Sequence, residues 1–235
     1  MDESPTSDPR LGVAVRASHA WYEDVFAAHS IQTRTEDGLW RAMSDPPRWH
    51  SAAKTLRPDV PEERVVAAVD RFDSCSVADS FGSLDLTAHG FVRLFTATWV
   101  SRLARTEDPA PWPEDWAIVI GEGELAQWNV LQDTTGVLLP SMLEHPRFTF
   151  LVRRSSGRMV AGGVLHRVDD AVELSNTWAT GDEADELRGV LACAENLHPP
   201  LPVVGYFGDD VLGAYTDAGF AQVGPQIVWL RESRP

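Results

Sequence analysis

The sequence predicts a mixed α/β (α+β) fold of two related units, each a mixed, mostly antiparallel sheet flanked by helices. Two observations predict it. Helical and strand patterns follow in the same order in both halves of the 235-residue chain. Each half also closes on a similar corner, "LTAHGF" at 86–91 and "AYTDAGF" at 214–220. A glycine between a helix and an apolar strand is common, so the order of the elements carries the prediction more than the corners do.

The first half contains two amphipathic helices, over 11–29 and 62–72, because apolar residues recur there at every third or fourth position. Pro61 suits the first helical position of the second helix. The turn pair Asp37-Gly38 predicts a hairpin. The other elements expected here are a strand closed by Pro58, an apolar strand at 74–81, a short helix ending at Gly90 and a strand at 92–100.

The second half repeats this order with a longer beginning. The expected elements are a buried strand at 116–120, a helix at 121–131, three antiparallel strands at 147–154, 159–168 and 171–179, a helix at 182–197, a strand at 201–207, a helix at 208–220 and a strand at 221–232.

Three boundaries divide the chain. Residues 1–10 are polar and acidic and are expected to form a disordered tail. Proline and acidic residues gather at 105–115, which predicts a linker between an N-terminal unit at 11–104 and a C-terminal unit at 116–235. Apolar strands at the junction suit a homodimer as well as an internal interface.

The composition excludes several classes of partner. Acidic side chains outnumber basic ones by 35 to 20, and a net charge of −15 repels nucleic acid and anionic membranes. Neither a signal peptide nor a membrane span is expected, because no segment is long and apolar enough. Cys75 and Cys193 lie in apolar runs, which indicates buried, reduced thiols and a cytoplasmic protein.

The counts and spacing of particular residue types give further indications about the source of the protein, metal binding and the role of its tryptophans. The basic residues are 19 arginines and one lysine, Lys54, which with many alanines indicates a GC-rich bacterial genome. The histidines show no metal-site spacing, so no metal is expected. Trp21, Trp40 and Trp49 can either anchor the core or line an apolar ligand pocket.

The corner "AYTDAGF" resembles the Tyr-x-x-x-Gly-Phe signature of the GNAT family of acyl-CoA-dependent N-acyltransferases. The strands and helix before it follow that family's order, and the first half resembles a shortened second unit. The resemblance implies a tandem GNAT-like protein that uses acetyl-CoA or another acyl-CoA as co-substrate and acts on a small amine. In the family the pantetheine arm enters between the fourth and fifth strands, which are 171–179 and 201–207 here.

The resemblance also implies where the chemistry lies. Tyr215 matches the tyrosine that commonly protonates the leaving thiolate, while the first corner has Leu86 at that place, so the active half is expected to be the second. Glu173 and His166 are candidate bases, and for all three titratable residues a structural role is the alternative. The implied cofactor-binding residues are Leu174, Ser175, Asn176, Thr177 and Gly181, and the implied substrate-binding residues are Asn176, Trp178 and Tyr206.

Strict alternation along the strand at 171–179 predicts how these side chains divide between its faces. Glu173, Ser175 and Thr177 are expected on one face, and Leu174, Asn176 and Trp178 on the other.

One loop departs from the family. The family places a glycine-rich loop before the crossover helix, where backbone N–H groups surround the pyrophosphate of CoA. The loop here, at 180–187, has one glycine and four carboxylates that would repel a pyrophosphate. The corresponding loop at 57–64 has no glycine. Two alternatives therefore stay open: a degenerate GNAT-like protein that binds a ligand or partner without acyl transfer, and a GNAT fold with CoA-independent biosynthetic chemistry.

Overall fold

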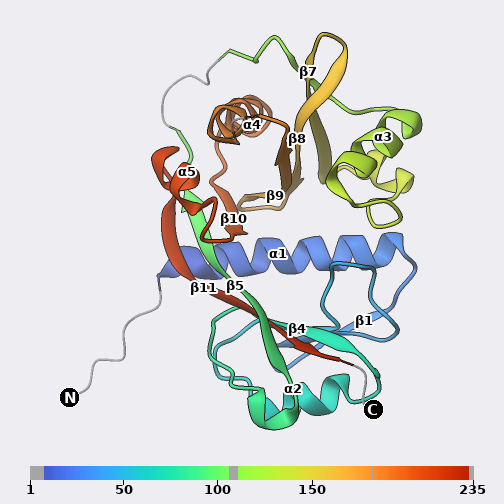
Figure 1. Cartoon of the computed structure of the whole chain (residues 1–235). Coiled ribbons are helices and arrows are strands. Elements are labelled where there is room, and N and C mark those ends of the chain that lie inside the picture. Colours follow the sequence, from blue (N-terminus) through green and yellow to red (C-terminus); the bar gives the residue numbers. More distant parts are fainter. Residues whose placement is uncertain (1–7, 106–110, 182, 233–235) are drawn as a thin grey trace, which may run out of the picture.

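In the computed structural model of the chain, helix α1 (Pro9–Ala28) crosses the middle of the molecule between its two halves (Figure 1). The carboxylate of Asp8 caps the helix by accepting the N–H of Arg10 at 2.9 Å. The helix therefore begins before the predicted position and takes in Pro9 and Arg10 of the predicted tail. Residues 1–7 of that tail lie outside the described residues.

The structure describes residues 8–105, 111–181 and 183–232. Their strands form one eleven-stranded sheet in the order β1-β2-β3-β4-β11-β5-β10-β9-β8-β7-β6. The predicted mixed α/β class is confirmed, with the sheets of the two halves joined into one. The strands are β1 (Thr33–Glu36), β2 (Leu39–Ala42), β3 (Ala53–Thr55), β4 (Cys75–Asp79), β5 (Val92–Arg102), β6 (Trp116–Ile118), β7 (Phe148–Ser155), β8 (Arg158–Arg167), β9 (Val172–Ala179), β10 (Val203–Phe207) and β11 (Ala221–Arg231).

Helices cover the sheet and connect its strands. Pro61 is the N-cap of α2 rather than its first residue, and a short helix after α3 was not predicted. The helical elements that follow α1 are α2 (Glu62–Val69), η1 (Thr87–His89), α3 (Glu122–Gln132), η2 (Pro140–Leu143), α4 (Glu183–Leu197) and α5 (Leu212–Asp217).

The last strand of each half lies against the other half. β5 pairs antiparallel with β10, β11 pairs antiparallel with β4, and the two strands pair with each other at the centre. Outside them lie two parallel pairs, β3–β4 connected through α2 and β9–β10 connected through α4. The boundaries at 11–104, 105–115 and 116–235 stay a prediction, because the exchanged strands form one continuous sheet.

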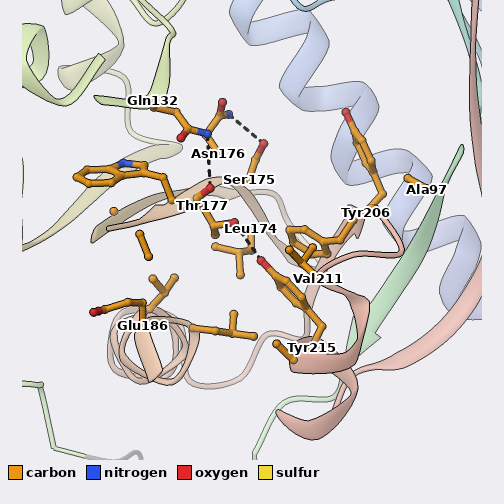
Figure 2. Close-up of a pocket in the computed structure, with 18 of the residues that line it drawn as sticks. Ala97, Gln132, Leu174, Ser175, Asn176, Thr177, Glu186, Tyr206, Val211 and Tyr215 are labelled. Carbon is orange, nitrogen blue, oxygen red and sulfur yellow. Dashed lines mark hydrogen bonds between the residues drawn. The ribbon is translucent and has the colours of Figure 1, made fainter. Parts of the chain in front are cut away.

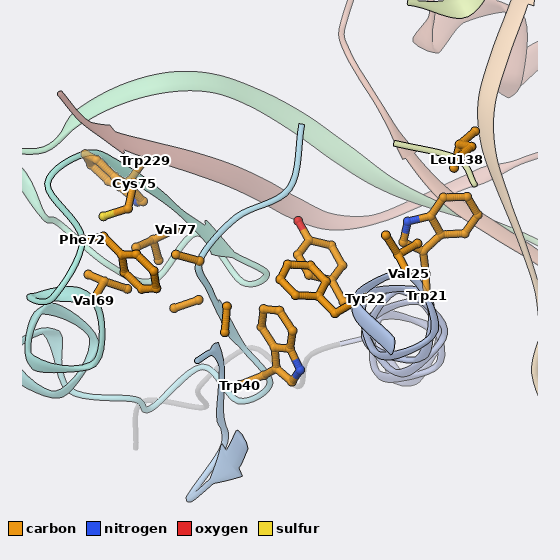
Figure 3. Packing of buried hydrophobic residues seen from close by; sticks show 14 of the residues in the cluster. Trp21, Tyr22, Val25, Trp40, Val69, Phe72, Cys75, Val77, Leu138 and Trp229 are labelled. Carbon is orange, nitrogen blue, oxygen red and sulfur yellow. The ribbon is translucent and has the colours of Figure 1, made fainter. Parts of the chain in front are cut away.

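One hydrophobic cluster joins the halves through α1 (Figure 3). Tyr22 and Phe26 of α1 meet the ring of Trp40 edge-on, at centroid distances of 5.2 and 4.8 Å. Trp21 is also buried, whereas the side chain of Trp49 is 67% exposed. These tryptophans therefore do not line one ligand pocket: two anchor the core and the third lies on the surface.

The strand predicted at 116–120 is buried only in part. β6 is the edge strand of the sheet and pairs with β7 alone. Trp116 and Val119 pack inward, but Ile118 and Ile120 are exposed. An apolar run cannot distinguish an edge strand from a central one, because that depends on the strand that pairs beside it.

Candidate active site

The parallel strands β9 and β10 separate after their first two residues. Val172 lies beside Val203 and Glu173 beside Val204, and no further pair joins the strands. A Cβ at Gly205 would lie 2.8 Å from the carbonyl oxygen of Leu174, so glycine permits the close approach from which the strands diverge. The gap is a cavity of about 350 Å³, which we call the splay pocket.

The splay pocket is lined from both faces of the sheet (Figure 2). Val190 of α4 and Val211 near α5 line it from one face. Tyr206 lines it from the other, and its phenol points toward α1. The cavity therefore runs through the gap between β9 and β10, and its volume lies in the range of small-molecule sites, roughly 300–1,000 Å³.

Most of the predicted site residues come together in the splay pocket. His166 and Gly181 are the two that do not line it. The predicted residues that do are Glu173, Leu174, Ser175, Asn176, Thr177, Trp178, Tyr206 and Tyr215.

Tyr215 is held rigidly at the pocket wall. Its Oη lies 3.0 Å from Oγ1 of Thr177, and its ring stacks on Phe207 at a centroid distance of 3.6 Å. Phe220, which follows the glycine of the corner, meets the ring edge-on. The phenol is thus fixed at the point where the two strands are apart.

A bulge in β9 changes the predicted alternation. Asn176 has a left-handed backbone, with φ of 51°, and the register with β8 shifts beside it. Thr177 therefore joins Leu174 on the α4 and α5 side, where it meets Tyr215. Trp178 packs against Trp128 of α3 on the other side. The predictions that Thr177 shares a face with Glu173 and that Trp178 shares one with Leu174 are both wrong, because the bulge inserts one residue.

Glu173 is a buried carboxylate at the inner wall of the splay pocket. Its side chain is only 2% exposed, so it is not a solvated strand residue. Burial raises its pKa to about 8, against the opposing effect of the Lys54 ammonium. The deprotonated form of a carboxyl group with this pKa is a stronger base than an ordinary carboxylate, and its population grows as the pH rises toward 8.

His166 lies directly opposite Glu173 in the β8–β9 ladder but outside the pocket. Its Nε2 lies 2.8 Å from Oδ2 of Asp24 on α1, and its ring packs between Trp21 and Phe148. Burial lowers the pKa of this imidazole. The geometry assigns His166 to the contact between α1 and the sheet.

The predicted phosphate loop at 180–187 is described only in part. Gly181 is exposed, and Asp182 and the side chains of Glu183 and Asp185 lie outside the described residues. Glu186 lines the pocket and pairs with Arg153 of β7.

The arginines of the corresponding loop in the first half form ion pairs with nearby aspartates. Arg57 pairs with Asp59 at 3.1 Å and Arg64 with Asp37 at 2.7 Å. The described residues thus fit a narrow acyl chain in the splay pocket, but offer no glycine-rich cradle for a pyrophosphate.

Several pocket residues were missed by sequence reasoning. Gln132 comes from α3, and its Nε2 lies 3.5 Å from the carbonyl oxygen of Thr177. Phe207, Val211 and Glu186 belong to elements that were predicted, but their direction depends on how those elements pack. The sequence indicated only that two strands would separate. It did not indicate which side chains of other elements would line the walls of the resulting pocket.

Other kinds of site are not seen within the described part of the chain. There, no group of three or more His, Cys, Asp or Glu side chains is arranged to hold a metal ion. None of the helices described combines the length and apolar character of a membrane span.

The architecture is that of the GCN5-related N-acetyltransferases, and the resemblance predicted from the second corner is confirmed at the level of the fold. A GCN5-related N-acetyltransferase from Kribbella flavida superposes with a TM-score of 0.64 at 16% identity, over 95% of this chain and 97% of that one. A GNAT-family acetyltransferase structure from Novosphingobium aromaticivorans, described as putative, gives 0.61 at 14% identity, over 99% and 100%. No family model matches the sequence, and a search of curated proteins found no significant match.

Proposed function

We propose that the chain is an N-acyltransferase that moves an acyl group from a thioester, such as acetyl-CoA or a longer acyl-CoA, to a small amine in the splay pocket. One observation supports this most strongly: the pocket holds a buried carboxylate, Glu173, and an oriented phenol, Tyr215, on opposite faces of one gap. An acyl thioester supplies an activated carbonyl with a sulfur leaving group.

The two residues account for both proton transfers of this reaction. As the amine nitrogen bonds to the carbonyl carbon, the Glu173 carboxylate accepts the proton that the nitrogen loses. As the carbon–sulfur bond breaks, the Tyr215 hydroxyl donates its proton to the sulfur. Solvent then removes a proton from Glu173 and returns one to Tyr215. Thr177 keeps the phenol in place through the 3.0 Å contact.

The other predicted residues that line the splay pocket have supporting roles in this proposal. Leu174 and Ser175 present an unpaired strand edge to the acyl arm, because β9 has left β10 at this point. Asn176, Trp178 and Tyr206 are proposed to contact the amine substrate. A cytoplasmic location and a homodimer stay predictions; two buried free thiols, Cys75 and Cys193, suit the former.

The acidic loop favours a second candidate, a protein that binds a ligand in the splay pocket without acyl transfer. A third, CoA-independent chemistry in the same pocket, has no observation of its own in its favour. Binding and turnover must therefore be tested separately.

Thermal unfolding with added thioesters tests binding. Acetyl-CoA, longer acyl-CoAs and S-acyl-pantetheine, which lacks the nucleotide, should each stabilise the protein, by about 2.7 kcal/mol at 100 times the dissociation constant. Because the described residues offer no glycine-rich cradle for the pyrophosphate, we expect S-acyl-pantetheine to bind nearly as well as the matching acyl-CoA. Absence of any stabilisation would exclude the transferase.

Release of free thiol with a panel of small amines tests turnover. Glu173→Gln should lower the rate by about a hundredfold or more, because the amide cannot accept the proton. Binding without thiol release for every amine would support the ligand-binding candidate instead.

A further inference from the structure

The single lysine of the chain is completely buried. Lys54 lies on β3 with none of its side chain exposed, and its Nζ has no hydrogen-bond partner among the described residues. The rings of Tyr22 and Trp99 lie 5.2 and 5.1 Å from this nitrogen. Aromatic faces compensate only part of the cost of burying an ammonium group, so a carboxylate is required nearby.

Two carboxylates, those of Glu173 and Asp79, act to raise the pKa of Lys54. One of the two already accepts several hydrogen bonds. Asp79 accepts hydrogen bonds from the backbone N–H groups of Phe81 and Leu84, at 3.2 and 2.9 Å, and from the hydroxyl of Thr55. The other is Glu173, whose Oε2 is buried and has no hydrogen-bond partner among the described residues, although the Ser18 hydroxyl of α1 also acts to lower the pKa of this carboxyl group.

Lys54 and Glu173 occupy corresponding positions in the two halves. Lys54 lies beside Ala78 in the parallel pair β3–β4, and Glu173 lies beside Val204 in the parallel pair β9–β10. Both side chains approach α1, since Tyr22 of that helix contacts the lysine and interacts electrostatically with the carboxylate. The exchanged strands thus bring one charge from each half to the same helix.

We propose that Lys54 is a positioning residue for Glu173: the ammonium of the first half keeps the carboxylate of the second half available as a base at the inner wall of the splay pocket. Lys54 does not line the pocket, so it acts through Glu173. The base role of Glu173 rests on the proposed function, whereas the coupling of the two charges does not.

The electrostatic effects are mutual. Burial raises the pKa of Glu173 to about 8 and lowers that of Lys54 to about 8, and each group opposes the shift of the other. Without the ammonium, the pKa of Glu173 would rise further, and the deprotonated fraction of the carboxyl group at neutral pH would fall in proportion. Without the carboxylate, the pKa of Lys54 would fall further.

Other titratable groups face this pair but are less suited to keep Glu173 deprotonated. Burial raises the pKa values of Tyr22 and Tyr206, so both phenols stay neutral. The imidazole of His166 is engaged by Asp24, and the carboxylate of Asp79 by backbone N–H groups. Burial also lowers the pKa of the histidine on α1. These groups are Tyr22 and His19 on α1, Tyr206 on β10, His166 on β8 and Asp79 on β4.

The single lysine makes the coupling directly measurable. In protein grown with lysine carrying ¹³C at Cε, the one labelled signal comes from Lys54, and its pH titration reports the ammonium. We expect a midpoint near 8 instead of the ordinary 10.5, and a decrease by about one unit or more in Glu173→Gln. The control is Glu186→Gln, which removes a pocket carboxylate paired with Arg153 and should leave the midpoint unchanged.

Either of two results in this titration would overturn the proposal: a midpoint near 10.5 in the unmodified protein, or the same midpoint with and without the Glu173 carboxylate. Neither result depends on acyl transfer, so failure of the proposed function remains distinguishable.

Enzyme kinetics test the consequence for the base. The acid limb of kcat/KM should lie near pH 8 in the unmodified enzyme and move up by about one unit or more in Lys54→Met, a loss of about tenfold at pH 7 that recovers in alkaline buffer. The same amine is used for both enzymes, so its own pKa contributes equally. A uniform loss at every pH would mean a purely structural role and would contradict the proposal; if this variant does not fold, the titration decides.

Discussion

The two Gly-Phe corners share one backbone conformation but differ in the side chain that this conformation positions. In the first, Gly90 donates to the carbonyl of Thr87 at 3.2 Å and Phe91 to that of Leu86 at 3.3 Å. In the second, the glycine donates to Thr216 and the phenylalanine to Tyr215, both at 3.0 Å. Both glycines have a left-handed backbone, with φ of 80° and 89°.

The difference lies in the fifth residue before each phenylalanine. Leu86 is fully buried and fills core volume, whereas Tyr215 carries its hydroxyl to Thr177 at the splay pocket. A turn that positions a side chain does not determine what the side chain does. The comparison therefore separates a corner whose side chain only fills the core from a corner that presents a hydroxyl group at the splay pocket.

The two parallel strand pairs, β3–β4 and β9–β10, differ in a similar way: the first is closed beyond its ladder and the second is open. Beyond the last register pair of β3 and β4, Thr55 accepts the N–H of Ser80 at 2.9 Å and donates to Asp79. These bonds join the two strands past the point where their ladder ends. Beyond Glu173, β9 and β10 have no such connection between described residues and enclose the splay pocket. An opening for a ligand thus depends on a few side chains as much as on the strand order.

The largest expected effect is on stability at the first corner. Leu86→Ala should lower the free energy of unfolding by about 2–5 kcal/mol, because it leaves a cavity in the core. It should leave thioester binding at the second corner intact. Chemical denaturation with and without ligand measures both quantities. Leu103→Ala, at a side chain that is 68% exposed, is the control and should change stability by less than about 0.5 kcal/mol.

Tyr215→Phe tests the second corner. It keeps the ring stack on Phe207 but removes the hydroxyl, so turnover should fall by about a hundredfold, equivalent to about 2.7 kcal/mol of transition-state stabilisation. Steady-state thiol release gives the rate, and thermal shift gives binding, which should be retained. Unchanged turnover would make both corners packing elements.

Substituting the two glycines tests whether the corners are equivalent. Gly90→Ala and Gly219→Ala should each cost about 1–2 kcal/mol, because a Cβ disfavours the left-handed backbone. No atom lies within 4 Å of a Cβ at the first position, and the nearest at the second is 3.6 Å away, so sterics add little. Gly123→Ala within α3 is the control and should stabilise slightly. Clearly unequal costs would contradict the equivalence.

The smallest effect concerns the loops before the crossover helices. Because the loop at 180–187 is acidic, added salt should strengthen acyl-CoA binding by a few-fold and leave S-acyl-pantetheine binding unchanged. A titration at several salt concentrations measures this. Weaker acyl-CoA binding in salt would instead indicate a basic phosphate site elsewhere.

Much of the fold could be predicted because it depends on local patterns. Helical periodicity identified α1 and α2 within a few residues, and Asp37-Gly38 has the left-handed backbone angles of a hairpin turn. The site was predicted only through the corner signature and the expected separation of two strands. The bulge at Asn176 escaped prediction because the pairing with β8 decides it.

The sequence by itself determined the order of the elements, the two corners and the presence of a tyrosine, Tyr215, in one corner where the other has Leu86, since each depends on residues that are close along the chain. Only the tertiary structure decided that β5 and β11 change places, that β9 and β10 separate, and that Lys54 and Glu173 approach one helix from opposite halves. The physical reason is that pairing between distant strands and the burial of a charge depend on neighbours from remote segments, which no local pattern specifies.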